Sequence, residues 1–321
     1  ADTASIRRVG KVREARPDLP IIAALRDTNV TLVRTLVRQG IADVAQLPFR
    51  ADELLAQILE AAAGLAGKAG TAALAPMVTV AGSTGGCGAT TVITHLAAEL
   101  ARSGNFPRGV CVVDLDMQSG EVAYYVGREP VVTVSSLLDA GERLDPEFLR
   151  GALTDSGHRF AIVAAPETIT ALDDIDGDQL LRLLSLIRRE FDCVLVDLPA
   201  DWTSWALSVV AASSEVLLVT ELSVAGLRQA KRRLELFGSI GISDAAIRLV
   251  ANRVERKLFR PIGLDEVEDV LGHAVAATLA DEGEAMNSAQ NEGQLITDIH
   301  RHSKFAADIQ ALCGALGVTG R

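Results

Sequence analysis

The stretch GSTGGCGATT, residues 82–91, has the residue types of a loop that holds phosphate groups. It follows an apolar run, MVTVA, that predicts a strand, and it precedes VITHLAAELARSG, whose apolar spacing predicts a helix. Its glycines let backbone N–H groups approach an anion closely at the helix N-terminus, and the hydroxyl of Thr90 is placed to bind Mg²⁺. Ala89 stands where such loops carry a lysine that reaches the β- and γ-phosphates. The segment therefore keeps the backbone chemistry of a phosphate site without its cation.

Three aspartates extend this candidate site. Asp114 and Asp116 follow an apolar run in VVDLDMQSG, and Asp197 follows another in FDCVLVDLPA. Because the carboxyl ends of parallel strands meet at the edge of the sheet where ligands bind, we expect these side chains beside the loop. We assign Thr90, Asp114 and Asp197 to a Mg²⁺ site. The alternative is that the aspartates end their strands and cap the helices that follow.

The elements that must position these residues form a repeating strand–helix pattern from residue 77 onward. This alternation predicts an α/β fold with a doubly wound, mostly parallel sheet. The predicted strands are Met77 to Ala81, Val110 to Asp114, Phe160 to Ala165, Cys193 to Asp197, Glu215 to Thr220, Arg248 to Asn252 and Ala274 to Leu279. Helical patterns lie between them, such as QLLRLLSLIRREF with one apolar stripe.

A separate unit precedes this domain. Residues 1–66 show a strand–helix–strand–helix order, with strands predicted over residues 18–25 and 41–49 and helices over residues 29–40 and 51–64. Residues 67–76 are rich in Gly and Ala and read as a linker, and residues 77–321 form the main domain. The N-terminal order resembles the second half of a response-regulator receiver domain, but Leu47 precedes Pro48 where that family has Lys-Pro. Either the chain is truncated or only half of the domain exists. We expect docking or dimerisation from this segment rather than phosphorelay signalling.

Composition restricts the choice of partners and compartment. The formal net charge is −11, which disfavours a protein that lies along DNA or an anionic membrane. The four cysteines are far apart without metal-ligand spacing, and no apolar run approaches the length of a membrane span. We therefore expect a cytoplasmic protein that reaches a membrane only indirectly.

Together, the loop, DLDMQSG and VLVDLPA resemble the deviant Walker motifs of the ParA/MinD family, P-loop proteins that bind ATP with Mg²⁺. Aligned with that pattern, Thr84 takes the position of the signature lysine and Ala89 that of the second lysine. The resemblance implies that Asp116 positions the attacking water, that Asp197 is the Walker B aspartate, and that Asn252 reads adenine. The nucleotide-binding residues implied in this way are Thr84, Gly85, Gly86, Cys87, Gly88, Ala89, Thr90, Thr91, Asn252 and Arg253.

The receiver-like segment, the loop ending in Ala-Thr-Thr and the stretches DLDMQSG and VAAPE narrow the resemblance to the CpaE/TadZ branch, localisation factors of Flp/Tad-type pilus assembly. This resemblance implies a homodimeric scaffold that binds ATP weakly or not at all, with weak or absent hydrolysis. Its implied partners are the pilus secretion machinery, including the assembly ATPase, at a cell pole or at the inner membrane. The alternative is an active MgATPase of the ParA/MinD class in chromosome or plasmid partitioning or cell-pole positioning.

Two further patterns leave alternatives open. Trp202 and Trp205 are spaced to share a helix face, which indicates packing against the sheet or a partner surface. The run RQAKRRLELF is basic and predicts a solvated helix face, with a DNA-binding patch as the less favoured reading because the chain is acidic overall.

Overall fold

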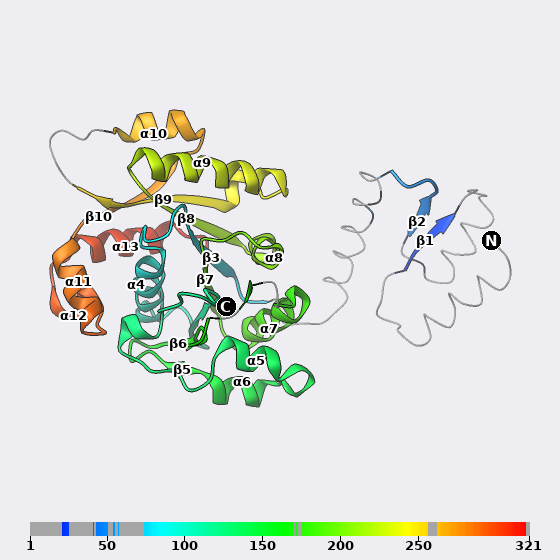
Figure 1. Ribbon diagram of the computed structural model, residues 1–321, viewed down its shortest axis with the longest axis horizontal. Helices are drawn as coiled ribbons and strands as arrows, with labels where there is room; N and C mark the ends of the chain where they lie inside the picture. The colour runs from blue at the N-terminus through cyan, green and yellow to red at the C-terminus, as the bar shows by residue number, and fades with distance from the viewer. Residues whose placement is uncertain are drawn as a thin grey trace. The chain divides into compact units, whose positions relative to one another are not determined.

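The structure is a computed structural model, and it describes residues 21–25, 41, 43–50, 54, 57, 74–169, 171–172, 175–255 and 262–318. The chain divides into two compact units, Ala1–Ala73 and Leu74–Arg321 (Figure 1). The candidate site lies entirely in the second unit.

The described part of the first unit is a pair of parallel strands, β1 (Ile22–Leu25) and β2 (Asp43–Gln46). Leu25 and Ile41 are buried and form a small apolar cluster. Both strands lie inside the two segments for which the sequence predicts strands. The predicted helix over residues 29–40 lies outside the described residues, and of the helix over residues 51–64 only Leu54 and Gln57 are described, both of them helical.

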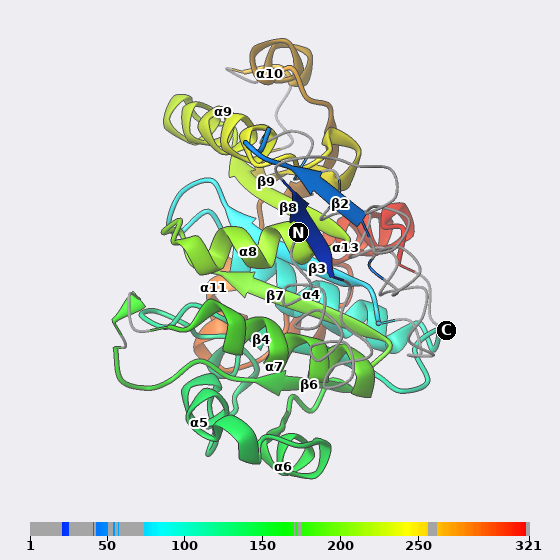
Figure 2. The ribbon, with the colours of Figure 1, turned by 90° about the vertical axis from the view of Figure 1, so that its right-hand side faces the viewer.

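An eight-stranded sheet forms the centre of the second unit. Its strand order is β10-β9-β8-β3-β7-β4-β6-β5, and every pairing is parallel except that of β5 with β6. Figure 2 shows the strands from β9 to β6 one above another in this order. The bounds are β3 (Met77–Gly82), β4 (Val110–Asp114), β5 (Thr154–Asp155), β6 (Phe160–Val163), β7 (Cys193–Leu198), β8 (Glu215–Glu221), β9 (Ile247–Val254) and β10 (Val275–Ala280).

Helices cover both faces of this sheet. Helices α4, α11, α12 and α13 lie on one face, and α7 and α8 lie on the other (Figure 1). The α-helices are α4 (Ala89–Arg102), α5 (Val134–Asp139), α6 (Pro146–Ala152), α7 (Gly177–Glu190), α8 (Ser204–Ala212), α9 (Val224–Ser239), α10 (Leu264–Leu271), α11 (Gly283–Asn291), α12 (Ile296–Ile299) and α13 (Lys304–Ala315). Three short 3₁₀ turns are η1 (Tyr124–Val126), η2 (Gly141–Arg143) and η4 (Asp244–Ala246).

Alternate residues of the strands supply the two cores. In β3, Val78 and Val80 pack with α4 and α13, whereas Met77 and Ala81 pack with α7 and α8. Because both faces are buried, the strands are apolar at nearly every position, which is why the sequence shows them as continuous apolar runs. The structure therefore confirms the predicted α/β class with a mostly parallel sheet.

Apart from β4, the predicted strands of the second unit differ from the structure by one or two residues at one or both ends, and the strand β5 was not predicted. The strand β6 ends at Val163, two residues earlier than predicted, because Ala164 pairs with Thr133 and its carbonyl accepts a hydrogen bond from the N–H of Val134 at 2.8 Å. The antiparallel strand β5 contains only two residues, too few for a periodic signal. Among the described helices, none is long and apolar enough to cross a bilayer.

The expectation that Trp202 and Trp205 share a helix face is wrong. Thr203 caps α8, since its hydroxyl accepts a hydrogen bond from the N–H of Ala206 at 3.2 Å, so Trp202 precedes the helix. The Trp202 ring instead makes an edge contact with Phe237, with 5.0 Å between ring centroids. Only Trp205 belongs to the helix, and it is buried against the sheet.

The basic run on α9 divides in the structure. Arg228, Lys231 and Arg232 are exposed, in agreement with the predicted solvated face. Arg233 turns inward, with its guanidinium carbon 5.6 Å from the centre of the Trp202 ring and its Nη2 donating to the carbonyl of Ala200 at 3.3 Å. This arginine therefore serves packing rather than a basic surface.

Candidate nucleotide-binding site

The sheet topology brings the predicted site residues to one edge. The strand β3 lies between β7 and β8, and the loop that follows it leads into α4. Asp114 ends β4, Asp197 lies one residue from the end of β7, and Asn252 lies near the end of β9. All these strands are parallel, so residues far apart in sequence meet at the carboxyl edge.

The loop from Gly82 to Gly88 is anchored to β8. The N–H of Ser83 donates to the carbonyl of Val219 at 2.7 Å, and the thiol of Cys87 donates to the same carbonyl at 3.4 Å. A Cβ on Gly82 would lie 2.8 Å from the Cys87 sulfur, so this packing requires glycine. The buried Cys87 is thus a structural anchor of the loop, and its burial raises the pKa of its thiol.

Two glycines give the loop its path. Gly86 has φ 76° and Gly88 has φ 91°, values that residues with a Cβ rarely adopt. Gly88 is the N-cap of α4, so the N–H groups of the first helical turn have no hydrogen-bond acceptor within the helix. Gly85 and Gly86 are exposed, and Thr84 and Ala89 are half-buried. The loop would therefore bind an anion through its backbone N–H groups.

Thr90 and Asp197 meet directly at the start of α4. The Thr90 hydroxyl donates to Oδ2 of Asp197 at 2.7 Å, although 107 residues separate them. Asp114 is the residue paired with Asp197 in the β4–β7 register. The structure thus brings together the three residues assigned to Mg²⁺, and a hydroxyl with two carboxylates is the oxygen donor set that this ion prefers.

A tight turn encloses the Asp114 carboxylate. Its Oδ1 accepts from the N–H of Asp116 and its Oδ2 from the N–H of Val122, both at 3.1 Å. A Cβ on Gly120 would lie 2.6 Å from Oδ1, so glycine is required for the turn to close. The sequence analysis did not single out Gly120, although DLDMQSG contains it.

Burial places the two carboxyls in an environment that disfavours their charge. Desolvation raises the pKa of Asp114 to about 7, against the lowering effect of its two N–H donors. Desolvation and the neighbouring Asp114 raise the pKa of Asp197 well above its usual range, and the Thr90 hydrogen bond opposes this only partly. A pair of this kind gains stability from a proton or from a cation bound between the two groups.

Asp116, predicted to position water, is half-buried at the same edge. Its Oδ1 accepts hydrogen bonds from the N–H groups of Gln118 at 3.2 Å and Ser119 at 2.9 Å. These bonds fix the turn and leave Oδ2 without a hydrogen bond among those found in the described residues. The aspartate therefore combines a turn-forming contact with an oxygen available to solvent.

The predicted adenine residue is engaged within the protein. The Asn252 side-chain amide donates to the carbonyl of Cys87 at 2.8 Å. A cavity of about 50 Å³ adjoins it, and its lining residues are Gly88, Thr91, Asn252, Arg253, Ala280, Asp281, Glu282, Gly283, Met286, Asn287, Gln290 and Phe305. A cavity of about 150 Å³ takes up benzene, so a purine needs more room than this one offers. Binding of a base here therefore requires the lining residues to move apart.

The C-terminal helices contribute residues that the sequence analysis missed. Gln290 of α11 donates from Nε2 to the Thr91 hydroxyl at 2.7 Å. Met286 and Phe305 line the same cavity. Gln290 stands in the stretch AQNEGQLI, in which no residue spacing links a particular side chain to the loop.

In sequence, the chain is similar to the septum site-determining protein MinD of Synechocystis sp., with 25% identity over 196 residues, 61% of this chain and 71% of the relative. It is also similar to maintenance of carboxysome distribution protein A of Synechococcus elongatus, with 27% identity over 175 residues, 52% and 67% of the two chains. No protein-family model matches the chain.

Solved structures match the second unit over nearly their full length. A ParA family ATPase from Chlorobium tepidum has a TM-score of 0.69 at 21% identity, covering 75% of this chain and 99% of that chain. The fold is that of the ParA/MinD ATPases. MinD of Pyrococcus horikoshii, complexed with Mg-ADP, has a TM-score of 0.63 at 21% identity and covers 75% and 95% of the two chains. Sequence and fold thus both support a MinD/ParA-like P-loop ATPase.

The phosphate end of this candidate site fits Mg²⁺ and a polyphosphate better than the base end fits adenine. Thr90 and Asp197 are already in contact, and the glycine backbone is in place. Neither position expected to carry a lysine is cationic, because Thr84 and Ala89 occupy them. The residues that resemble a Mg²⁺ and phosphate site therefore lie together in the structure. A positive charge that binds the phosphates would have to come from a residue other than Thr84 or Ala89.

A buried histidine joins the loop helix to the C-terminal helices. His95 contacts the carbonyl of Thr91 through Nδ1 at 2.7 Å, and its Nε2 accepts from the N–H of Ile296 at 3.1 Å. An acceptor role for Nε2 requires the neutral ring. Burial correspondingly lowers the pKa of His95 to about 4.

We expect His95 to make the protein sensitive to acid. Since its folded-state pKa is depressed, its contribution to stability is present above about pH 6.5 and is lost as pH falls toward about 4, a change of about 3 kcal/mol. Denaturant unfolding at several pH values checks this by comparison with His95→Gln: the stability gap between the two proteins closes on acidification. His302→Gln, at an exposed position, is the control. A gap that stays constant from pH 7 to pH 4 contradicts the assignment.

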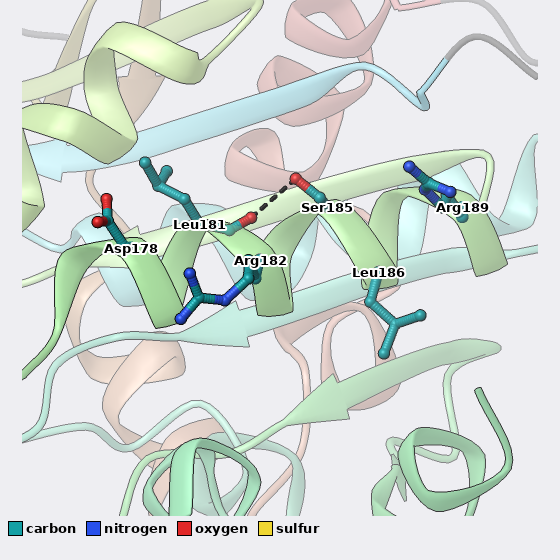
Figure 3. A pocket seen from close by; sticks show the side chains of 6 residues that line it. All are labelled: Asp178, Leu181, Arg182, Ser185, Leu186 and Arg189. Atoms are coloured by element: carbon teal, nitrogen blue, oxygen red, sulfur yellow. Dashed lines mark hydrogen bonds between the residues drawn. The ribbon is translucent and has the colours of Figure 1, made fainter. Parts of the chain in front are cut away.

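A second, larger pocket does not belong to this edge. Its volume is about 470 Å³ and its lining residues, Asp178, Leu181, Arg182, Ser185, Leu186 and Arg189, all project from α7 (Figure 3). The Ser185 hydroxyl donates to the Leu181 carbonyl of its own helix at 2.8 Å. The described lining residues of this pocket come from one helix, whereas the loop gathers groups from several strands, so the chemistry of the protein is assigned to the smaller cavity and the loop.

Proposed function

We propose that this protein is a dimerising localisation scaffold for Flp/Tad-type pilus assembly that binds MgATP weakly through a ParA/MinD-like domain. The observation that carries the nucleotide part is the 2.7 Å hydrogen bond between Thr90 and Asp197 at the start of α4, beside a glycine loop without lysines. The pilus part rests on the sequence resemblance to the CpaE/TadZ branch, including the receiver-like order of the first unit.

The roles of the residues follow from their chemistry. Thr90, Asp197 and Asp114 hold Mg²⁺, the N–H groups of the loop bind phosphate oxygens, and Asn252 faces the base once it leaves the Cys87 carbonyl. Bound nucleotide supplies the γ-phosphoryl group, and Asp116 orients water toward it. Phosphoryl transfer is accelerated mainly by positive charge at the transferred group, so a site without lysines is expected to turn over slowly.

The scaffold would act through a second copy of itself and through the pilus machinery, including its assembly ATPase. It would work in the cytoplasm, at a pole or at the inner membrane to which its partners bring it. The relatives support a role in placing other structures, since one is a septum site-determining protein and another maintains carboxysome distribution. The net charge of −11 argues against DNA as the partner.

An active MgATPase of the ParA/MinD class, in partitioning or cell-pole positioning, is the second candidate. It is favoured by the retained carboxylates at the sheet edge and by relatives that include MinD. Steady-state phosphate release that disappears in Asp116→Ala, while nucleotide binding persists, distinguishes this enzyme from the scaffold.

Titration with a fluorescent ATP analogue tests the proposed nucleotide site. Each missing lysine removes a charge-assisted hydrogen bond of about 1.5–3 kcal/mol, so we expect a Kd on the order of 0.1–1 mM. Thr90→Ala should weaken binding about tenfold with Mg²⁺ and leave it unchanged in EDTA. Thr94→Ala, one helical turn further on and bonded only to its own helix and to His95, is the matched control.

Light scattering during the same titration reports the mass of the particle. Binding that depends on Mg²⁺ and is accompanied by dimerisation supports a nucleotide-controlled scaffold. A protein that is dimeric regardless, with no binding at millimolar nucleotide, contradicts the nucleotide part and leaves a constitutive scaffold.

A further inference from the structure

Arg253 has an unusual backbone for its residue type. Its φ is 53°, in the left-handed region that favours glycine, at the carboxyl end of β9 beside Asn252. Non-glycine residues held in this region are concentrated at functional sites, because the surrounding structure must compensate for the strain. The position therefore calls for an explanation beyond strand formation.

The guanidinium of Arg253 is directed toward β8, the strand between β9 and β3. Its Nη1 lies 2.6 Å from Oε1 of Glu221, the residue that faces Asn252 across the β8–β9 register. The strand β8 lies between β9 and β3, and β3 leads into the phosphate loop. Through this contact, the positive charge of Arg253 therefore lies on the side of β9 that faces β3. Arg253 is the only lysine or arginine among the described residues that line the cavity beside Gly88 and Thr91.

The charges of Arg253 and Asp197 both act on one phenol, that of Tyr125. Burial and the adjacent Glu121 raise the pKa of Tyr125, and the charges of Asp197 and Arg253 act on it in opposite directions. Both charged groups thus lie within electrostatic range of one side chain. With Asp114 and Asp116 nearby, the surroundings are strongly acidic, and a triphosphate needs a cation there.

We infer that Arg253 is the phosphate-binding cation that takes the place of the missing loop lysines, and that Glu221 holds it off the site until a polyphosphate arrives. The inference rests on the proposed nucleotide binding and adds the residue that supplies its positive charge. The Arg253 side chain is 55% exposed and that of Glu221 33%, so their ion pair is weak and easily exchanged. A phosphate group accepts two parallel hydrogen bonds from a guanidinium and competes well for it.

The exchange predicts effects of opposite sign for the two partners. Removing the charge of Arg253 removes a phosphate contact, whereas removing the charge of Glu221 frees Arg253 for the phosphate. In Arg253→Gln, we expect MgATP binding at least tenfold weaker than in the wild type. In Glu221→Gln, we expect it threefold or more tighter. The double variant should bind like Arg253→Gln, because Glu221 acts through the arginine.

The same two strands provide a matched control. Arg248 of β9 pairs with Glu215 of β8 through Nε at 3.3 Å, at the opposite end of the strands. Arg248→Gln removes the same charge at a distance from the loop, and its affinity should stay within twofold of the wild type. Because glycine accepts a φ of 53°, Arg253→Gly removes the charge without backbone strain and shows whether a loss of binding reflects misfolding.

The experiment is a titration of the full chain and these variants with a fluorescent ATP analogue, with competition by inorganic tripolyphosphate and by adenosine. The inference requires Arg253→Gln to weaken competition by tripolyphosphate and not by adenosine. The reverse pattern overturns it and assigns Arg253 to the base. Equal affinity of the wild type and Arg253→Gln, or weaker binding in Glu221→Gln, also overturns it while the proposed function stands. A wild type that binds no nucleotide overturns this inference together with the nucleotide part of the proposed function.

Discussion

Replacing Gly88 with alanine should abolish nucleotide binding and lower the free energy of unfolding by about 2–5 kcal/mol. Gly88 has φ 91°, which strains any residue with a Cβ. The added Cβ would also collide with the side-chain amide of Asn252, which must then give up its bond to the Cys87 carbonyl. The substitution therefore disturbs the backbone of the loop and the strand that supports it. Denaturant unfolding and the ATP-analogue titration measure the two effects.

A neighbouring glycine provides the control for this prediction. Gly85 lies in the same loop, but its φ is outside the left-handed region and a Cβ there would have no neighbour within 4 Å. Gly85→Ala should change the free energy of unfolding by less than about 1 kcal/mol. Equal stability of the two variants would show that the fit between Gly88 and Asn252 does not control the loop.

Replacing Asp197 with asparagine should stabilise the ligand-free protein at pH 8 while removing its Mg²⁺-dependent binding. The pKa of Asp114 is raised from 3.8 to about 7, so ionisation of this group in the folded protein lowers the free energy of unfolding by about 4 kcal/mol. Because the folded-state pKa of Asp114 is raised, the stability contributed by its protonated carboxyl is fully present below about pH 4 and is lost as pH rises through about 7. The pKa of Asp197 is raised for the same first reason, desolvation, and secondly by the charge of Asp114, so removal of the Asp197 charge should make the ligand-free protein more stable at pH 8.

Unfolding at pH 5 and at pH 8 without divalent cations checks this prediction. The free energy of unfolding of Asp197→Asn should be clearly higher than that of the wild type at pH 8 and only slightly higher at pH 5. Asp192→Asn is the matched control, because Asp192 is equally buried but is paired with Arg108 at 2.7 Å. Its substitution should destabilise the protein at both pH values. An Asp197→Asn protein that is less stable than the wild type at pH 8 would show that the site does not store this charge repulsion.

The positions of the elements were largely predictable from the sequence. Strand β4 has the predicted bounds, Val110–Asp114, and the other predicted strands of the second unit are shifted by no more than two residues at either end. Strands buried on both faces must be apolar throughout, and the pattern is local to each strand. The convergence of Asp114 and Asp197 at one edge also followed, since it depends only on parallel order. The helices predicted in the first unit fall mostly outside the described residues.

What the sequence by itself determined are properties that one segment carries alone: apolar runs that become strands, glycines that permit a left-handed loop, and the absence of lysines at Thr84 and Ala89. What only the tertiary structure decided are partners across elements. The bond from Asn252 to the Cys87 carbonyl and the pairing of Arg253 with Glu221 span 165 and 32 residues. Such contacts depend on strand order, register and side-chain direction together, and the raised pKa of Asp114 depends on burial by the surrounding chain. Short-range residue spacing does not predict these distances, because they are set by packing once the sheet has formed.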